Sequence, residues 1–312
     1  MRQRHIPVLL EEVLKGLGIR EGGVYLDATV GEGGHSLEIL RRSARAQVIG
    51  IDQDPEALAS AGAALGEFGQ RVRLCRRNFR YMGEVVQEMG VPAVDGILLD
   101  LGVSSLQLDL SERGFSFSQD GPLDMRMDPD GALTAGMIVN SYSEEDLARI
   151  ISTYGEERLS RRIAQAIAQE RSKNPITTTA GLAVIVSRVP GMSRVKSIHP
   201  ATRTFQALRI EVNDELNALR EALVSGIGLL VPGGRMAVIS FHSLEDRIVK
   251  RTFRRMADPC ECPPDFPMCV CGALPMGSVR TRRPIIPGES ERRDNPRSRS
   301  ARLRIFERAP RA

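Results

Sequence analysis

Residues 24–35 read Val-Tyr-Leu-Asp-Ala-Thr-Val-Gly-Glu-Gly-Gly-His, and this stretch decides the fold. It is a short apolar run that ends in a cluster of glycines, and the next apolar run ends at Asp52. In a doubly wound parallel sheet, ligands bind beyond the carboxyl ends of the strands. Gly31, Gly33 and Gly34 can make the sharp turn that such a site needs, and Asp52 can reach the hydroxyls of a ribose. The pattern therefore predicts a nucleotide site in an α/β domain.

Two classes of enzyme use such a turn, namely those that bind nicotinamide dinucleotides and those that bind S-adenosylmethionine. The dinucleotide fingerprint is Gly-x-Gly-x-x-Gly, and counted from Gly31 its third glycine falls on Ser36. The fingerprint therefore fails. An acid inside the strand followed by a compact glycine loop, as in residues 27–34, resembles motif I of class I methyltransferases. A glycine-rich turn of any α/β protein would explain the loop alone, but it does not explain the loop together with Asp52.

The composition is that of an ordinary folded protein, because 42% of the 312 residues are hydrophobic and 26% are charged. The N-terminal apolar run is too short for a signal peptide, and no segment approaches a membrane span. We therefore expect a cytoplasmic protein that does not contact a membrane. The net charge of +4 is uneven, since residues 276–312 hold eleven Arg against four acids. Such a basic tail can bind phosphates, although a solvated charged segment has the same composition.

Strand-like and helix-like patterns alternate along the first hundred residues. Short apolar runs predict buried strands, and helical periods fill the gaps between them, with Asp54-Pro55 as a helix start. Leu303 and Ile305 alternate with Arg302 and Arg304, which predicts an antiparallel edge strand at 301–308. The predicted strands before it are 24–30, 47–52, 72–77, 95–101 and 234–241, and the predicted helices are 34–44, 55–66 and 80–89.

The regular alternation stops between about 109 and 200, which indicates an inserted helical subdomain. Ser143 is followed by three acids and then by apolar residues at helical spacing, a typical helix start. Further helices are predicted at 158–172 and 177–189. The main fold then resumes with one long amphipathic stripe that should pack on the sheet. It consists of Phe205, Leu208, Val212, Leu216, Leu219 and Leu223.

Nearly the whole chain resembles the RsmH (MraW) methyltransferases, in stretches too long and too unusual to match by chance. The resemblance implies transfer of the methyl group of S-adenosylmethionine to the exocyclic N4 of a cytidine in the decoding centre of 16S ribosomal RNA. The matching stretches begin with His5-Ile-Pro-Val-Leu-Leu-Glu-Glu, Gly31-Glu-Gly-Gly-His-Ser, Gly50-Ile-Asp-Gln-Asp and Leu99-Asp-Leu-Gly-Val-Ser-Ser-Leu-Gln. They continue with Arg113-Gly-Phe-Ser-Phe, Leu123-Asp-Met-Arg-Met-Asp, His199-Pro-Ala-Thr-Arg-Thr-Phe-Gln-Ala-Leu-Arg-Ile-Glu-Val-Asn, Ser240-Phe-His-Ser-Leu-Glu-Asp-Arg and Asn295-Pro-Arg-Ser-Arg-Ser-Ala.

The resemblance also implies the residues that bind the cofactor. Loop amides can face the carboxylate of the methionine part, Asp52 can accept from both ribose hydroxyls, and Phe79 can lie against the adenine or simply belong to the core. Asp100 ends an apolar strand at the ligand edge, where a purely structural role is the weaker interpretation. The full set is Gly33, Gly34, His35, Asp52, Phe79, Asp100 and Gln107.

The expected chemistry is an in-line attack of an amine on a methyl group. The lone pair of the cytosine amine is delocalised, so an acceptor for its hydrogens assists the reaction. Asp100 or a backbone carbonyl of Leu101-Gly102 can be that acceptor. Many methyltransferases of amino groups in nucleic acids have Asp/Asn-Pro-Pro-Tyr here, whereas this chain has Asp100-Leu-Gly-Val-Ser-Ser. The aromatic residue that would hold a base splayed out of RNA is therefore not assigned.

Candidate substrate residues follow the strand at 234–241 and the end of the insertion. His242 leaves the strand at the ligand edge, where we favour a catalytic or substrate role over a structural one. Arg203, Arg209 and Asn213 could hold phosphates or the cytosine edge, but a polar helix face or an ion pair with Glu211 or Asp214 explains them equally well. Arg126, beside Asp124, is similarly open. The substrate candidates are His199, Arg203, Arg209, Asn213, Ser240 and His242.

Four of the five cysteines lie between residues 260 and 271, as Cys260-x-Cys262 and Cys269-x-Cys271. In a reducing compartment, such a group favours a metal over disulfides. The spacing within each pair is shorter than in typical zinc sites, so a zinc site and a metal-free loop both remain open. A zinc ion here would brace the basic tail and would not catalyse.

The sequence thus predicts an α/β class I methyltransferase domain (1–108 and 201–312), a Rossmann-like doubly wound sheet with a helical insertion (109–200) that recognises RNA. The predicted partner is 16S rRNA, within a small-subunit particle, and the oligomeric state stays open. A non-catalytic RNA-binding assembly factor with the same fold is the alternative, and binding of S-adenosylmethionine would distinguish the two. An oxidoreductase would instead bind a nicotinamide dinucleotide.

Overall fold

The computed structural model describes residues 7–192, 199–263, 268 and 270–310. These residues form two compact units, residues up to 102 together with those from 216 onward, and residues 103–215. The sequence placed the boundaries at 108/109 and 200/201. The second boundary lies at 215/216 because the helix Thr202–Asn213 packs its apolar face into the core of the helical unit.

The first unit is built on a seven-stranded sheet in the order β3-β2-β1-β4-β5-β7-β6. The first five strands in this order are mutually parallel, and β7 is antiparallel to both β5 and β6. This is the strand order of class I methyltransferases, and it confirms the predicted fold class. The strands are β1 (Val24–Asp27), β2 (Gln47–Asp52), β3 (Val72–Arg76), β4 (Val94–Asp100), β5 (Leu230–Ser240), β6 (Gly277–Val279) and β7 (Arg302–Arg308).

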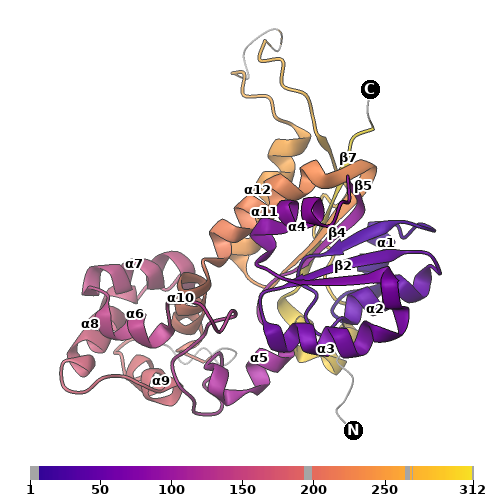
Figure 1. The fold of residues 1–312 in the computed structure, drawn as a ribbon. Helices are drawn as coiled ribbons and strands as arrows, with labels where there is room; N and C mark the ends of the chain where they lie inside the picture. The colour runs from indigo at the N-terminus through magenta and orange to yellow at the C-terminus, as the bar shows by residue number, and fades with distance from the viewer. Residues whose placement is uncertain (1–6, 193–198, 264–267, 269, 311–312) are drawn as a thin grey trace. The chain divides into compact units, whose positions relative to one another are not determined.

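Helices cover both faces of this sheet (Figure 1). Neighbouring residues of one strand point to opposite faces, so that Tyr25 packs with α1, α2 and α3 while Leu26 packs with α4, α11 and α12. The helices are α1 (Leu10–Leu17), α2 (Gly34–Arg42), α3 (Pro55–Leu65), α4 (Met82–Glu88), α11 (Glu215–Leu229), α12 (Ser243–Ala257) and α13 (Glu289–Asp294). Short 3₁₀ turns are η1 (Gly66–Arg71), η2 (Phe79–Tyr81) and η4 (Pro296–Ser300).

The second unit is helical and has its own apolar core. Ser143 caps α7 as predicted, because its hydroxyl accepts a hydrogen bond from the amide of Asp146 at 3.0 Å. The elements are α5 (Ser105–Asp109), η3 (Ser111–Arg113), α6 (Ala135–Ser141), α7 (Glu144–Gly155), α8 (Ser160–Arg171), α9 (Thr179–Ser187) and α10 (Thr202–Asn213).

The long amphipathic stripe predicted at 205–223 is not one helix. Asp214 adopts a left-handed conformation, with φ 48° and ψ 38°, and separates α10 from α11. Phe205 and Leu208 belong to the core of the helical unit, whereas Leu219 and Leu223 pack on the sheet. The apolar residues keep a helical spacing on both sides of Asp214 because both helices are amphipathic. The sequence pattern therefore does not reveal the break.

The C-terminal strand was placed correctly but its surroundings were not. β7 is not an edge strand, since the three-residue β6 pairs along its outer side. The guanidinium of Arg304 is buried in an ion pair with Asp246. A segment as short as β6 carries no detectable period, so the sequence could not reveal it.

Candidate functional site

The glycine loop between β1 and α2 lies at the carboxyl edge of the parallel strands. Gly31 and Gly33 have positive φ angles of 53° and 84°, which residues with a side chain rarely adopt. A Cβ atom on Gly33 would also lie 3.2 Å from the side chain of Leu65. Gly33 precedes α2 as its N-cap, and no side chain caps the first amides of the helix. Amides at a helix start attract negative charge, as a carboxylate of a ligand would supply.

Asp52, at the end of β2, is fixed by this loop. Its Oδ2 accepts from the amide of Gly31 at 3.0 Å, and its Oδ1 accepts from the amide of Asp54 at 2.9 Å. Burial raises the pKa of this carboxyl to about 6, although the two amides counteract the shift. The group is therefore mostly ionised at neutral pH, and each oxygen keeps a lone pair that can accept from a hydroxyl.

Asp27, at the end of β1, stabilises the glycine loop and the helix that follows it. The sequence did not predict this role. It is 1% exposed and accepts from the hydroxyl of Ser36 at 2.7 Å. Burial raises its pKa to about 6. Ser36 occupies the position at which a dinucleotide fingerprint has its third glycine, and its hydroxyl is needed for this bond. An acid inside a buried strand was the signal that could have identified Asp27.

Asp100, at the end of β4, has a carboxyl group that is more strongly perturbed than those of Asp27 and Asp52. Burial raises its pKa to about 8, and the nearby acids Asp27 and Glu245 add to the shift. Its amide donates to the hydroxyl of Thr29 at 2.6 Å, so β1 and β4 are joined here. Its Oδ1 is buried and has no hydrogen-bond partner among the described residues. An unsatisfied buried oxygen costs free energy, and a cationic or hydrogen-bonding ligand would satisfy it.

His35 in α2 and Phe79 in η2 have different surroundings. The Nε2 atom of His35 lies 3.0 Å from the carbonyl oxygen of Val8, so it carries the proton. The Nδ1 atom of the same ring is 3.8 Å from Oδ2 of Asp100. Phe79 begins η2, is half-buried and packs against the apolar core around α4. It therefore serves the core at least in part.

Ser240 and His242, the two candidates at the end of β5, both contact other parts of the protein. The hydroxyl of Ser240 is buried and lies 3.4 Å from the carbonyl oxygen of Arg302 on β7. His242 caps α12 in a reciprocal arrangement with Glu245, whose carboxylate accepts from the amides of Phe241 and His242. Ser240 thus contacts β7 and His242 caps α12, and their roles toward a substrate remain predictions.

The remaining candidates belong to the helical unit. Gln107 is buried and closes a capping box with Ser104 at the start of α5. Arg209 forms two parallel hydrogen bonds with Glu215, at 2.8 and 2.9 Å, whereas Glu211 accepts from the hydroxyl of Tyr142. Arg209 thus pairs with Glu215, an acid that the sequence did not suggest.

Further side chains of this unit also make internal contacts. Asn213 accepts from the amide of Met127 and donates to the carbonyl of Met125, each at 2.8 Å. Arg203 donates to the carbonyl of Glu156, and the ring of His199 lies 4.6 Å from that of Phe117. Arg126 and Asp124 form an ion pair at 2.7 Å. These contacts fix the helical unit and leave substrate roles as predictions.

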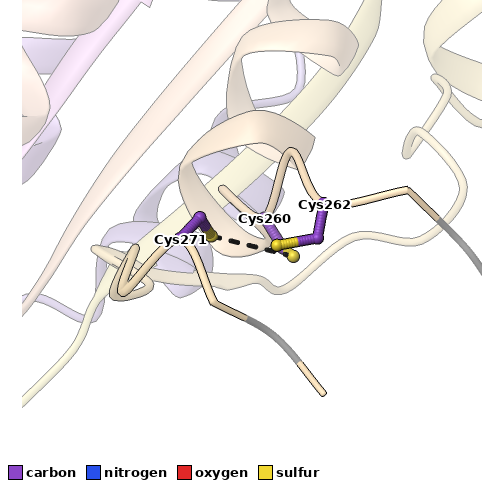
Figure 2. Close-up of side chains that lie close together, drawn as sticks. All are labelled: Cys260, Cys262 and Cys271. Carbon is purple, nitrogen blue, oxygen red and sulfur yellow. Dashed lines mark hydrogen bonds between the residues drawn. The ribbon is translucent and has the colours of Figure 1, made fainter. Parts of the chain in front are cut away.

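Part of the predicted metal group is also brought together. Sulfur atoms of Cys260, Cys262 and Cys271 lie within 4.8 Å of one another, as Figure 2 shows. Cys269 lies outside the described residues. No helix in the described part of the chain is long and apolar enough to cross a membrane.

Comparison with known proteins identifies the family. The model of the MraW methylase family matches residues 2–309. The chain belongs to this family. It is 54% identical over 306 residues to the ribosomal RNA small subunit methyltransferase H of Symbiobacterium thermophilum, covering 97% of this chain and 96% of that protein. The protein of the same name from Heliobacterium modesticaldum is 55% identical, covering 97% of this chain and 98% of that protein. Membership of the MraW family removes the oxidoreductase alternative.

Proposed function

We propose that this MraW family member transfers the methyl group of S-adenosylmethionine to the exocyclic N4 of a cytidine in the decoding centre of 16S rRNA. The observation that carries the proposal is the carboxyl edge of the sheet, where the glycine loop, Asp52 and the unpaired Oδ1 of Asp100 meet. Relatives more than 50% identical over nearly their whole length are named as methyltransferases of small-subunit ribosomal RNA. We further propose that the protein acts in the cytoplasm on an assembled small-subunit particle.

The described residues fit the proposed cofactor. The uncapped start of α2 suits the carboxylate of its methionine part, and Asp52 suits the two ribose hydroxyls. Asp100 offers a buried, unpaired oxygen to its ammonium group, and Phe79 offers a half-buried ring to its adenine. We assign His35 to positioning Asp100, and we retain Gln107 from the family resemblance. When bound, the cofactor supplies an electrophilic methyl group on a sulfonium.

Asp100 is also the proposed acceptor for a hydrogen of the cytosine amine. A carboxyl group with a pKa of about 8 is mostly protonated at pH 7 and accepts poorly. Positive charge on a bound cofactor would lower that pKa and ionise the group. The carboxylate would thus become an acceptor only when the methyl donor is in place. A backbone carbonyl of Leu101-Gly102 remains the alternative acceptor.

The proposed RNA contacts are electrostatic. Arg282, Arg283 and Arg299 are exposed on the C-terminal segment, and exposed arginines bind phosphates independently of sequence. Not every arginine of this segment is available, because Arg302 and Arg304 bind Asp246. His199, Arg203, Arg209 and Asn213 of the helical unit stay candidates for the base and its phosphates, with His242 and Ser240 on the other unit.

Methylation of small-subunit particles by the purified protein tests this proposal. We expect N4-methylcytidine in the nucleosides of 16S rRNA, measured by mass spectrometry, after incubation with S-adenosylmethionine. Asp100→Asn, which keeps the shape but cannot ionise, should lower the rate by a factor of about 100 or more. Glu67→Gln, a change at an exposed acid, is the matched control and should retain the wild-type rate.

Two results would contradict the proposal. Wild-type turnover by Asp100→Asn would exclude the role of this carboxylate. Failure of the wild-type protein to bind S-adenosylmethionine in calorimetry, with retained binding to particles, would favour the non-catalytic assembly factor.

A further inference from the structure

The described residues between α12 and β6 form no helix or strand. The base of this loop is tied by a hydrogen bond of 2.9 Å from the amide of Met276 to the carbonyl of Met256. None of the described residues from 258 to 276 belongs to the apolar cores of the molecule. Val270 and Leu274 are instead 73% and 83% exposed. Small segments that are ordered without an apolar core commonly contain a metal or disulfides.

The cysteines of this loop have a geometry that suits a metal. The sulfurs of Cys260 and Cys271 lie 3.9 Å apart, far beyond the length of a disulfide bond. A tetrahedral zinc ion with Zn–S bonds of about 2.3 Å holds its sulfurs about 3.8 Å apart. The sulfur of Cys262 completes a group within 4.8 Å (Figure 2). The distance between Cys260 and Cys271 therefore matches one edge of a zinc–thiolate tetrahedron, and Cys262 lies near enough to supply a third sulfur.

A backbone contact supports the same interpretation. The amide of Val270 donates to the sulfur of Cys262 at 3.4 Å, a bond that stabilises a thiolate. Cys260 and Cys262 lie near the start of the loop and Cys271 lies nearer to its end. An ion bound by all three would therefore link the two ends of the loop. The short Cys-x-Cys spacing does not prevent this, because both sulfurs reach the same group.

We propose that Cys260, Cys262 and Cys271 bind a thiophilic divalent cation, Zn²⁺, which fixes the loop between α12 and β6. The proposal is independent of the methyl transfer and assigns the ion no part in it. Three thiolates leave one position of a tetrahedral ion to a further ligand, which is not identified among the described residues.

Metal analysis of the full-length protein tests the site. The protein, purified under reducing conditions and incubated with Zn²⁺ before dialysis, should retain about one equivalent per chain. Cys260→Ser and Cys271→Ser should each lower zinc affinity by more than the about 10–100-fold that loss of an outer-shell partner costs. Cys75→Ser, which changes the half-buried cysteine of β3, is the matched control and should retain the ion.

Two further measurements do not depend on enzymatic activity. Co²⁺ in place of zinc should give the intense near-ultraviolet absorption of cobalt–thiolate bonds, and a chelator should increase proteolytic cleavage within residues 258–276. Because the loop is exposed, the serine variants should keep the thermal stability of the chelated wild-type protein. Wild-type protein without retained zinc or cobalt–thiolate absorption would overturn the proposal. Equal zinc retention by both serine variants would do the same.

Discussion

At the residue scale, the burial of Asp100 opposes its ionisation. Its side chain lies near Asp27 and Glu245, and its Oδ1 is without a partner among the described residues. The protonated form is favoured in the folded protein because the carboxylate would be poorly solvated there. A carboxyl oxygen that is buried at this edge of the sheet without a hydrogen-bond partner among the described residues is typical of a binding site.

The pH dependence of stability follows from this shift. The folded pKa of Asp100, about 8, lies above its ordinary value of 3.8, so the folded state holds a proton that the unfolded state has lost. Stability therefore falls as pH rises between these two values. Asp100→Asn should remove this loss and raise the free energy of unfolding at pH 8.5 by roughly 1 kcal/mol or more, which is about 2–4 °C in melting temperature.

Thermal unfolding of the cofactor-free protein at several pH values measures the effect. The advantage of Asp100→Asn should shrink toward pH 5, where wild-type Asp100 is protonated in the folded state. Asp52 does not owe its raised pKa to Asp100, so its contribution cancels in the comparison. Glu67→Gln should show no such trend. An advantage that is constant from pH 5 to 8.5 would reject the explanation.

At the scale of elements, helix boundaries follow from capping groups that the sequence displays. Asp54 caps α3 by accepting from the amide of Glu56, and Pro55 begins the helix. Ser143 caps α7, and three acids in its first turn interact favourably with the helix dipole. His242 caps α12 through an imidazole nitrogen, which is an uncommon capping group and was not expected.

Loss of the cap on α7 should loosen that helix. Ser143→Ala removes the acceptor for the amide of Asp146 and should cost about 1 kcal/mol. Hydrogen exchange of amides in α7 should therefore accelerate about fivefold. Ser141→Ala changes an equally exposed serine whose hydroxyl donates to a carbonyl within α6, and it should leave α7 unaffected. Equal exchange rates in both variants would show that the cap is dispensable.

At the scale of the whole molecule, a buried ion pair joins α12 to β7. The carboxylate of Asp246 accepts from Arg304 at 2.6 Å and from Arg302 at 3.1 Å. Burial alone would raise the pKa of Asp246, but the two arginines lower it. The C-terminal segment is thereby tied into the sheet, so its charge is only partly available for RNA.

Breaking this pair should destabilise the protein strongly. Asp246→Ala leaves the buried guanidinium of Arg304 without its counter-charge, and such losses cost about 3–5 kcal/mol. Chemical denaturation followed by circular dichroism should show the change. Glu261→Ala breaks an exposed pair with Arg255 and should cost at most about 1 kcal/mol. A small effect of Asp246→Ala would indicate that water reaches Arg304.

Much of the fold was predictable because buried parallel strands and capped helices have local signatures. The runs ending at Asp52 and Asp100, the glycine turn and the cap at Ser143 all lie where the sequence placed them. The strand at 302–308 and its antiparallel direction were also predicted correctly. In each case the signal is a pattern within a few residues, set by backbone geometry and burial.

Contacts between distant residues were not predictable from such patterns. The break at Asp214, the short β6 and the bond between Ser36 and Asp27 depend on what packs against each segment. The contacts of Arg209 and Asn213 within the protein also depend on packing. Periodicity could not show whether these side chains bind the protein itself or a ligand.

The sequence by itself determined the family, the sheet with its glycine loop, and the acids at the strand ends, because each is written in consecutive residues. Only the tertiary structure decided which of those acids are paired. It satisfies Asp52 and Asp27 with hydrogen bonds and leaves an oxygen of Asp100 without a partner among the described residues. The physical reason is that pairing and desolvation depend on groups brought together from distant parts of the chain.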